Sequence, residues 1–251
     1  MAAALLESKT EAASAANGDI LVGFRATGGT GSTKNLVVNL GAATALESAT
    51  TAVDLGNINA DLTATYGSDW ATRANLFWGA VGTVGSFDAI GTNPAKTVYG
   101  SRAANNAWLR ANGSSQGAVT NKVVAFMGAF NSASTVGVTY SNAVLQTTSE
   151  ANYWATYQTG GTLPNSGPAP GISFAFFNPS IEGAFGSGTA LVHLYRVKPA
   201  AGAEISTAAD YLGMLVLESS GKLVFEPATS VSRLSIVTPV VTVLQGSTTA
   251  T

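Results

Sequence analysis

Short apolar segments separated by clusters of turn-forming residues recur along this chain, and no other feature constrains its fold as strongly. Residues 19–26 read DILVGFRA, and residues 35–40 read NLVVNL after the glycine-rich stretch 27–32. Apolar runs of this length between glycine and polar turn residues are typical of β-strands. The pattern predicts two neighbouring strands joined by a glycine-rich connection.

The same signals predict further strands toward the C-terminus. They cover residues 123–130, 135–140, 172–177, 190–197, 211–217, 222–226 and 235–244. The clearest hairpin joins 211–217 to 222–226 through Glu-Ser-Ser-Gly at 218–221, because all four are turn-forming residues.

Two segments depart from the strand pattern. In residues 59–81 the side chains of Leu62, Tyr66 and Trp70 have helical spacing, but Gly67 predicts two short pieces rather than one helix. Residues 149–158, which end at a pair of glycines, form the second helical candidate. We expect both segments to be helical inserts in a β-rich chain.

These elements predict a mainly β protein with a single β-sandwich or jelly-roll-like domain and two short helical inserts. Residues 103–120 and 159–171 are rich in small polar residues, glycine or proline and are predicted as loops. No shift in charge and no long linker divides the chain. We expect an N-terminal arm at residues 1–17, the β-rich domain at 18–229 and a C-terminal strand or tail at 230–251.

Charged residues make up only 10% of the 251 residues, against roughly 25% in an ordinary soluble domain. The 12 lysines and arginines are scattered, whereas a nucleic-acid interface needs clustered positive charge. No apolar run approaches the roughly 20 residues of a membrane span, and there is no cysteine to ligate a metal. We therefore expect no nucleic-acid partner, no membrane span and no cofactor. A sparsely charged surface of this kind tolerates close contact with copies of itself or with neutral polymers.

Three blocks of the chain resemble one protein family. GDILVGFRATGGTGSTKNLVVNLGAAT at 18–44 and NINADLTATYGSDWATRANLFWGAVG at 57–82 resemble the N-terminal half of secreted PEP-CTERM proteins, which exosortases sort, particularly those of Verrucomicrobia and related bacteria. The hairpin YLGMLVLESSGKLVFEPA at 211–228 resembles the strand pair before their sorting signal. The resemblance implies export, an extracellular or cell-surface location, and no assigned enzymatic activity. Of the family's Val-Pro-Glu-Pro-like motif, apolar span and basic cluster, only Glu226-Pro227 has a counterpart here.

Reactive residue types are few, and their spacing selects no catalytic set. His193 is the only histidine and lies in a predicted strand, which excludes a multi-histidine metal site. A hydrolase would need two carboxylates in one site, but the spacing singles out no pair. The carboxylates on structured segments are Asp61, Asp69, Asp88, Glu150, Glu182 and Asp210. We expect that the protein is not an enzyme.

Oxygen-bearing side chains gather at Asp54, Asn57, Asn59 and Asp61. Calcium loops use such clusters, but the EF-hand order is absent here. Helix capping and Asx-turns account for the same residues without a metal. Calcium binding stays an open alternative at this point.

The C-terminal segment is strongly β-branched. Residues 233–244 read RLSIVTPVVTVL, with Pro239 near the middle and apolar side chains of both parities. Apolar residues on both faces indicate a buried strand, which either pairs inside its own sheet or inserts into the sheet of a neighbouring subunit. The residues predicted to mediate self-assembly are Leu234, Ile236, Val237, Val240, Val241, Val243 and Leu244.

Aromatic residues among polar neighbours provide a second hypothesis. Trp108, Trp154 and Tyr157 are predicted at the surface, where they would stack on sugar rings, whereas Trp70 and Trp78 are expected in the core. The leading hypothesis is an extracellular structural protein that self-associates through β-strand pairing into a filament, surface layer or matrix. The first alternative is a glycan-binding module that binds extracellular polysaccharide, and the second is a carboxylate-based polysaccharide hydrolase.

Overall fold

Antiparallel β-structure dominates the computed structural model, which describes residues 13–103, 113–157, 181–185, 190–200 and 209–231. Within these ranges ten strands form one sheet in the order β3-β10-β9-β8-β5-β4-β1-β2-β6, and β7 pairs with β4 beside that path. The strands are β1 (Asp19–Ala26), β2 (Lys34–Ala42), β3 (Val53–Asn57), β4 (Leu76–Thr83), β5 (Val98–Arg102), β6 (Ala143–Thr147), β7 (Glu182–Ala184), β8 (Ala190–Val197), β9 (Asp210–Leu217) and β10 (Lys222–Pro227). The predicted mainly β, sandwich-like fold class is confirmed.

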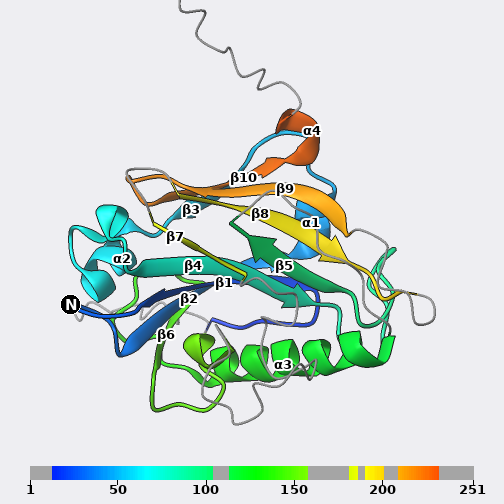
Figure 1. Ribbon diagram of the computed structural model, residues 1–251, viewed down its shortest axis with the longest axis horizontal. Helices are drawn as coiled ribbons and strands as arrows, with labels where there is room; N and C mark the ends of the chain where they lie inside the picture. Colours follow the sequence, from blue (N-terminus) through cyan, green and yellow to red (C-terminus); the bar gives the residue numbers. More distant parts are fainter. Residues whose placement is uncertain (1–12, 104–112, 158–180, 186–189, 201–208, 232–251) are drawn as a thin grey trace, which may run out of the picture.

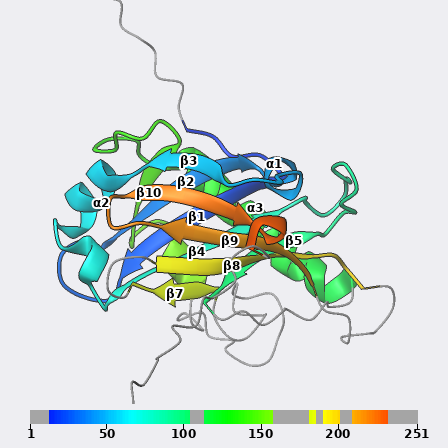
Figure 2. The same cartoon turned by 90° about the horizontal axis from the view of Figure 1, so that it is seen from above.

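The sheet curls so that its two halves form two layers (Figure 1). β3, β10, β9 and β8 lie over β4, β1, β2 and β6, and β5 connects the halves between β8 and β4. Viewed from above in Figure 2, β10, β9 and β8 run side by side across the molecule. The helix α3 (Gly113–Ser132) lies beneath the lower layer. One sheet therefore makes a sandwich, and one helix covers the outer face of its lower half.

The central strands are buried on both faces, and the protein accordingly has two cores. In β1, Ile20, Val22 and Phe24 point between the two layers, whereas Leu21 points toward α3, and all four are fully buried. Successive side chains of a strand point to opposite faces, so a continuous apolar run needs cover on both sides. In the inner core Phe24 stacks on Trp78 of β4, with ring centroids 5.9 Å apart.

Helix α3 provides the outer cover and corrects two predictions. The sequence predicts a loop over residues 103–120 and a strand over 123–130, and both predictions are wrong from Gly113 onward. Val124 lies on the exposed side of the helix but is also apolar. The apolar run that begins at residue 123 therefore has no polar interruption from which the helical period could be recognised. The side chains buried against the sheet recur every three or four residues, at Val119, Val123, Phe126 and Phe130.

The two predicted helical inserts have different outcomes. Residues 59–81 contain two short pieces as predicted, α2 (Asn59–Tyr66) and the 3₁₀ turn η1 (Trp70–Thr72), but their last part is strand β4. The insert at 149–158 is reduced to the 3₁₀ turn η2 (Trp154–Tyr157). Two further short helices, α1 (Ala43–Glu47) and α4 (Ala228–Val231), follow β2 and β10. The prediction that Trp70 and Trp78 lie in the core is confirmed.

Strand prediction succeeds where an apolar run is long and bounded by turns. The predicted strands at 19–26, 35–40 and 190–197 and the hairpin at 211–226 are present as β1, β2, β8, β9 and β10. The strand predicted at 135–140 is wrong, because Gly137 has a φ of +84° and the neighbouring Ser134 forms only an isolated bridge. The predicted strands at 172–177 and 235–244 lie outside the described residues. The sequence does not predict the short strands β3, β5, β6 and β7, because each contains only three to five residues, too few to show a clear alternation of apolar and polar side chains.

A glycine on β1 lets η2 lie flat against the sheet. Gly23 is paired with Gly79 of β4, and a Cβ atom at Gly23 would lie 2.0 Å from the Trp154 indole. By contrast, a Cβ atom at Gly128, in the middle of α3, would meet nothing within 4 Å. Close packing therefore requires the first glycine, whereas a side chain at the second would meet no neighbour among the residues that the structure describes.

We expect opposite effects of alanine at these two glycines. Gly23→Ala should lower the free energy of unfolding by about 1–3 kcal/mol, because the new methyl group overpacks the Trp154 site. Gly128→Ala should raise the free energy of unfolding by about 0.5–1 kcal/mol, because alanine lowers the conformational entropy of the unfolded chain and meets no neighbour in the folded helix. Urea unfolding followed by circular dichroism measures both. Equal effects of the two substitutions would contradict the packing of η2 on β1.

Candidate self-assembly interface

The sheet ends in two short edge strands that one segment of the chain joins. β3 and β6 lie at the two ends of the strand order and contain five residues each. Residues 133–142, here called the bridging segment, contact both of them. We call β3, β6 and the bridging segment together the seam. Edge strands are where another chain can add a strand, so the seam is the candidate interface for self-association.

The N–H groups on the free side of β6 are bonded within the chain. Leu145 donates to the carbonyl of Ser134 at 2.8 Å, in the isolated bridge to the bridging segment. Ala143 donates to the carbonyl of Tyr140 at 3.0 Å, and Thr147 donates to the Glu150 carboxylate at 3.1 Å. These alternate residues point away from β2. The bridging segment and its neighbours thus protect an edge that would otherwise pair with another strand.

The opposite edge, β3, is irregular. Its pairing with β10 shifts register between Lys222 and Val224, and Gly56 has a φ of +99° with its N–H donating to the side chain of Asp54 at 2.9 Å. The Tyr140 hydroxyl of the bridging segment donates to the carbonyl of Leu55 at 2.7 Å. One side chain therefore links the bridging segment to β3.

Asp61 holds the bridging segment in place. Its carboxylate, fully buried on α2, accepts the N–H and the hydroxyl of Thr139 at 2.6 and 2.8 Å and the N–H of Tyr140 at 2.9 Å. A buried carboxylate is tolerated when its oxygens are bonded in this way. Of the calcium candidates, Asp61 thus accepts hydrogen bonds from Thr139 and Tyr140, and Asp54 pairs with Lys222 at 3.3 Å. In the described ranges no group of three or more His, Cys, Asp or Glu residues could hold a metal ion.

Apolar side chains at the seam are only half-buried. Val53 and Leu55 of β3, Leu145 of β6 and Val138 of the bridging segment all pack at the border of the inner core. Val136, next in the bridging segment, is 82% exposed. The inner core is therefore less complete at the seam than around β1, where apolar side chains are fully buried.

The two ends of the described chain lie in different settings. Ala13 and Ala15 of the N-terminal arm are buried, and Ala15 exchanges two hydrogen bonds with the Asn131 side chain at the end of α3, at 2.6 and 2.9 Å. At the other end α4 packs against β9 and β10, so the chain leaves the described region beside the strand that neighbours β3. The seven predicted self-assembly residues between 234 and 244 lie beyond this point, outside the described residues.

Trp154 is not a surface residue, so its prediction as a sugar-stacking residue is wrong. The indole is fully buried, packs on Phe126 of α3 with ring centroids 5.5 Å apart, and donates its N–H to Glu182 at 2.8 Å. Its polar sequence neighbours are turn residues, and the open space over Gly23 that receives the ring is not visible in local sequence. Trp108 and the side chain of Tyr157 lie outside the described residues.

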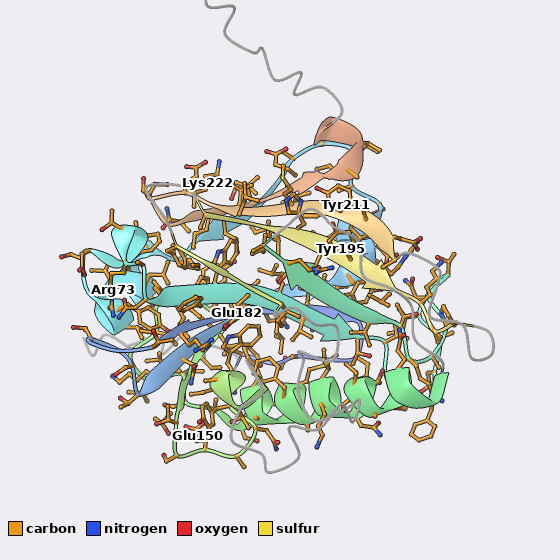
Figure 3. All side chains as sticks on the ribbon, in the orientation of Figure 1. Arg73, Glu150, Glu182, Tyr195, Tyr211 and Lys222 are labelled. Atoms are coloured by element: carbon orange, nitrogen blue, oxygen red, sulfur yellow. The ribbon has the colours of Figure 1, made fainter. Side chains whose placement is uncertain are left out.

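Glu182 is the most deeply buried acid of an ion pair in the described chain. It lies beside β4 and above α3 in Figure 3, on strand β7. The Arg25 guanidinium donates to both of its oxygens, with the closest approach at 2.6 Å, and also lies over the Phe77 ring at 5.2 Å. Burial raises the pKa of the Glu182 carboxyl, and the bonds from Arg25 and Trp154 offset this only in part. The ion pair ties β7 and η2 to β1.

A second polar network holds α1 on the sheet. Glu47 accepts the hydroxyl of Tyr99 at 2.7 Å and the amide of Asn93 at 3.0 Å, and it pairs with Arg196 at 3.2 Å. Arg196 also pairs with Asp210 at 2.8 Å. Burial and the bond to Glu47 raise the pKa of Tyr99. Asp61, Glu182 and Asp210, three of the hydrolase candidates, thus each bond to groups that hold elements together.

His193 occupies an ordinary strand position on β8. It is half-buried, and its Nδ1 lies 3.2 Å from the hydroxyl of Tyr211 on β9. Burial lowers the pKa of His193 and raises that of Tyr211 to about 12, so both groups are neutral at pH 7. Tyr195 and Tyr211 lie close together on the upper layer (Figure 3), with ring centroids 5.2 Å apart. Tyr195 and Tyr211 extend the outer core, which is the core that contains Leu21 and the buried side chains of α3.

Comparisons of the chain with protein-family models, with curated proteins and with solved structures found no match. None of the helices in the described part of the chain has the length and apolar composition needed to cross a membrane.

The buried Glu182 carboxyl should make stability depend on pH in a recognisable way. Its pKa in the folded protein is raised above the ordinary value of 4.5, so the folded state holds the proton more tightly than the unfolded state. Stability should therefore fall as pH rises from about 4.5 through the folded pKa, by at most about 1.4 kcal/mol per pH unit. Glu182→Gln should flatten this decline, whereas Glu218→Gln at an exposed turn should not. Unfolding free energies from pH 4 to 8 test this, and an unchanged slope in Glu182→Gln would refute it.

Loss of Asp61 should open the seam without unfolding the sheet. Asp61→Ala removes three hydrogen bonds to Thr139 and Tyr140, and bonds to charged groups contribute about 1.5–3 kcal/mol. Amide hydrogen exchange at Ala143 and Leu145 should then accelerate at least about tenfold, while β1 amides stay protected. Asp69→Ala, which removes an exposed carboxylate close by, is the matched control. Unchanged exchange at β6 in Asp61→Ala would show that other contacts hold the bridging segment.

Proposed function

We propose that this protein is a non-catalytic structural component of the bacterial cell surface or extracellular matrix that self-associates through β-strand pairing. The observation that carries the proposal is the seam, where the two edges of one antiparallel sheet meet an irregular segment rather than each other. A strand added there would pair with the edge N–H groups of β6 in place of the irregular segment and would cover half-buried apolar side chains.

The C-terminal segment has the composition of the strand that would be added. Pro239 divides residues 233–244 into two stretches, 234–238 and 240–244, each of the same length as β3 and β6. Both stretches are rich in β-branched residues, which suit a pleated and buried strand. The N-terminal arm is a poorer donor, because Ala13 and Ala15 pack on α3 of their own chain.

An extracellular location is supported by the sequence. The blocks at 18–44, 57–82 and 211–228 resemble secreted PEP-CTERM proteins, and the chain has no cysteine and few charges. Few charges weaken the electrostatic repulsion that keeps copies of a protein apart. The described acids that bond to partners act as fold-holding groups, which agrees with a role that requires no reaction.

Removal of the C-terminal segment should abolish self-association. We expect the full chain and a variant ending at residue 244 to form filaments or other polymers, and a variant ending at residue 232 to stay monomeric. Light scattering after size-exclusion chromatography and electron microscopy measure this, and the variant ending at 244 controls for loss of the polar last residues. A full chain that is a monodisperse monomer at high concentration, or a 232-residue variant that still assembles, would overturn the proposal.

A further inference from the structure

We infer that the seam is the acceptor site for the C-terminal strand, and that this strand comes from a second copy of the chain and displaces the bridging segment. The inference rests on the proposed self-association. It adds the place where the strand binds, the chain that supplies it and the segment that must move.

Few apolar contacts hold the bridging segment. Val136 is 82% exposed and Thr139 is also exposed, whereas Ala133, Val138 and Tyr140 are half-buried. Its backbone forms a single isolated bridge to β6, between Ser134 and Leu145. Segments with few buried apolar contacts open far more readily than core strands do. The bridging segment is thus the part of the sheet's border that a competing strand can replace.

A donated strand would satisfy the β6 groups that the bridging segment leaves, whereas Asp61 would need new donors for the three bonds that it now accepts from Thr139 and Tyr140. The N–H groups of Ala143 and Leu145 point away from β2 and would pair with the new strand in place of Tyr140 and Ser134. The side chains that would face the half-buried apolar groups of β3 and β6 share one parity. They are Leu234, Ile236, Val240 and Leu244.

Pro239 is compatible with this site because the two edges differ. Proline lacks an N–H and is tolerated at edges and bulges but not inside a regular ladder. β3 has a register shift opposite β10, and the N–H of Gly56 is directed to Asp54. A strand that pairs with β6 on one side would therefore face the irregular edge of β3 on its other side. The missing N–H of Pro239 would cost little there.

A second copy is the source, because the described part of the chain ends at α4 beside the upper layer, whereas β6 lies in the lower layer at the other end of the strand order. The chain continues for 20 residues beyond Val231, which follows β10 on the upper layer. Twenty extended residues span at most about 70 Å, so the segment is long enough to reach a neighbouring molecule. Each copy then donates one strand and accepts one, which is a head-to-tail contact that builds filaments unless it closes into a ring.

The test is a reversible lock on the bridging segment. The chain has no cysteine, and Ser134 and Leu145 face each other in an antiparallel bridge, a separation that a disulfide can span. The Ser134→Cys/Leu145→Cys variant should assemble when reduced and stay monomeric when oxidised. A Leu191→Cys/Val216→Cys variant, which locks a paired position between β8 and β9 away from the seam, should assemble in both states.

The outcomes separate the inference from the proposed function. Assembly that requires residues 233–244 but persists in the oxidised Ser134→Cys/Leu145→Cys variant overturns the seam as acceptor and leaves self-association standing. No assembly by the full chain in either redox state overturns both. A monomer in which a cysteine at Val240 forms a disulfide with one at Leu145 of the same chain shows insertion within one molecule, and overturns the exchange between copies.

Discussion

The central strands are buried on both faces, and the layered arrangement of the molecule follows from the need to cover them. β1 carries fully buried side chains at four of its first six positions, with Leu21 on one face and Ile20, Val22 and Phe24 on the other. An apolar strand of this kind cannot leave either face in water. The sheet covers one face by curling over itself, and α3 and η2 cover the other. Gly23 and the Arg25–Glu182 pair then fix how closely η2 approaches β1.

The sequence predicted the long strands and the hairpin because their patterns are local. β1, β8 and the β9–β10 hairpin contain apolar runs bounded by turn residues, and the sandwich-like class follows from them. Helix α3 was missed because Val124 on its exposed side fills the gap in the helical period. Trp154 was misplaced because its burial depends on Gly23, more than 130 positions earlier in the chain. The seam was not predictable either, because Asp61, Tyr140 and Leu55 are brought together only by the curl of the sheet.

The same curl determines where the sheet presents its two edge strands. A curled sheet of finite length has two edges, and an exposed edge invites pairing with another chain. Here both edge strands are short, and the N–H groups of β6 that point away from β2 are bonded within the chain. The Asp61 carboxylate anchors the bridging segment between β6 and β3. In the proposed function, a strand exchanged at the seam would have to displace this segment before copies of the chain could pair.

A structure of the assembled protein by electron cryo-microscopy tests this account most directly. The account predicts density for a strand between β6 and β3 that is continuous with the C-terminus of a neighbouring subunit, with residues 133–142 displaced from the seam. Subunits that contact one another while residues 133–142 remain bonded to Leu145 and Leu55 would contradict it.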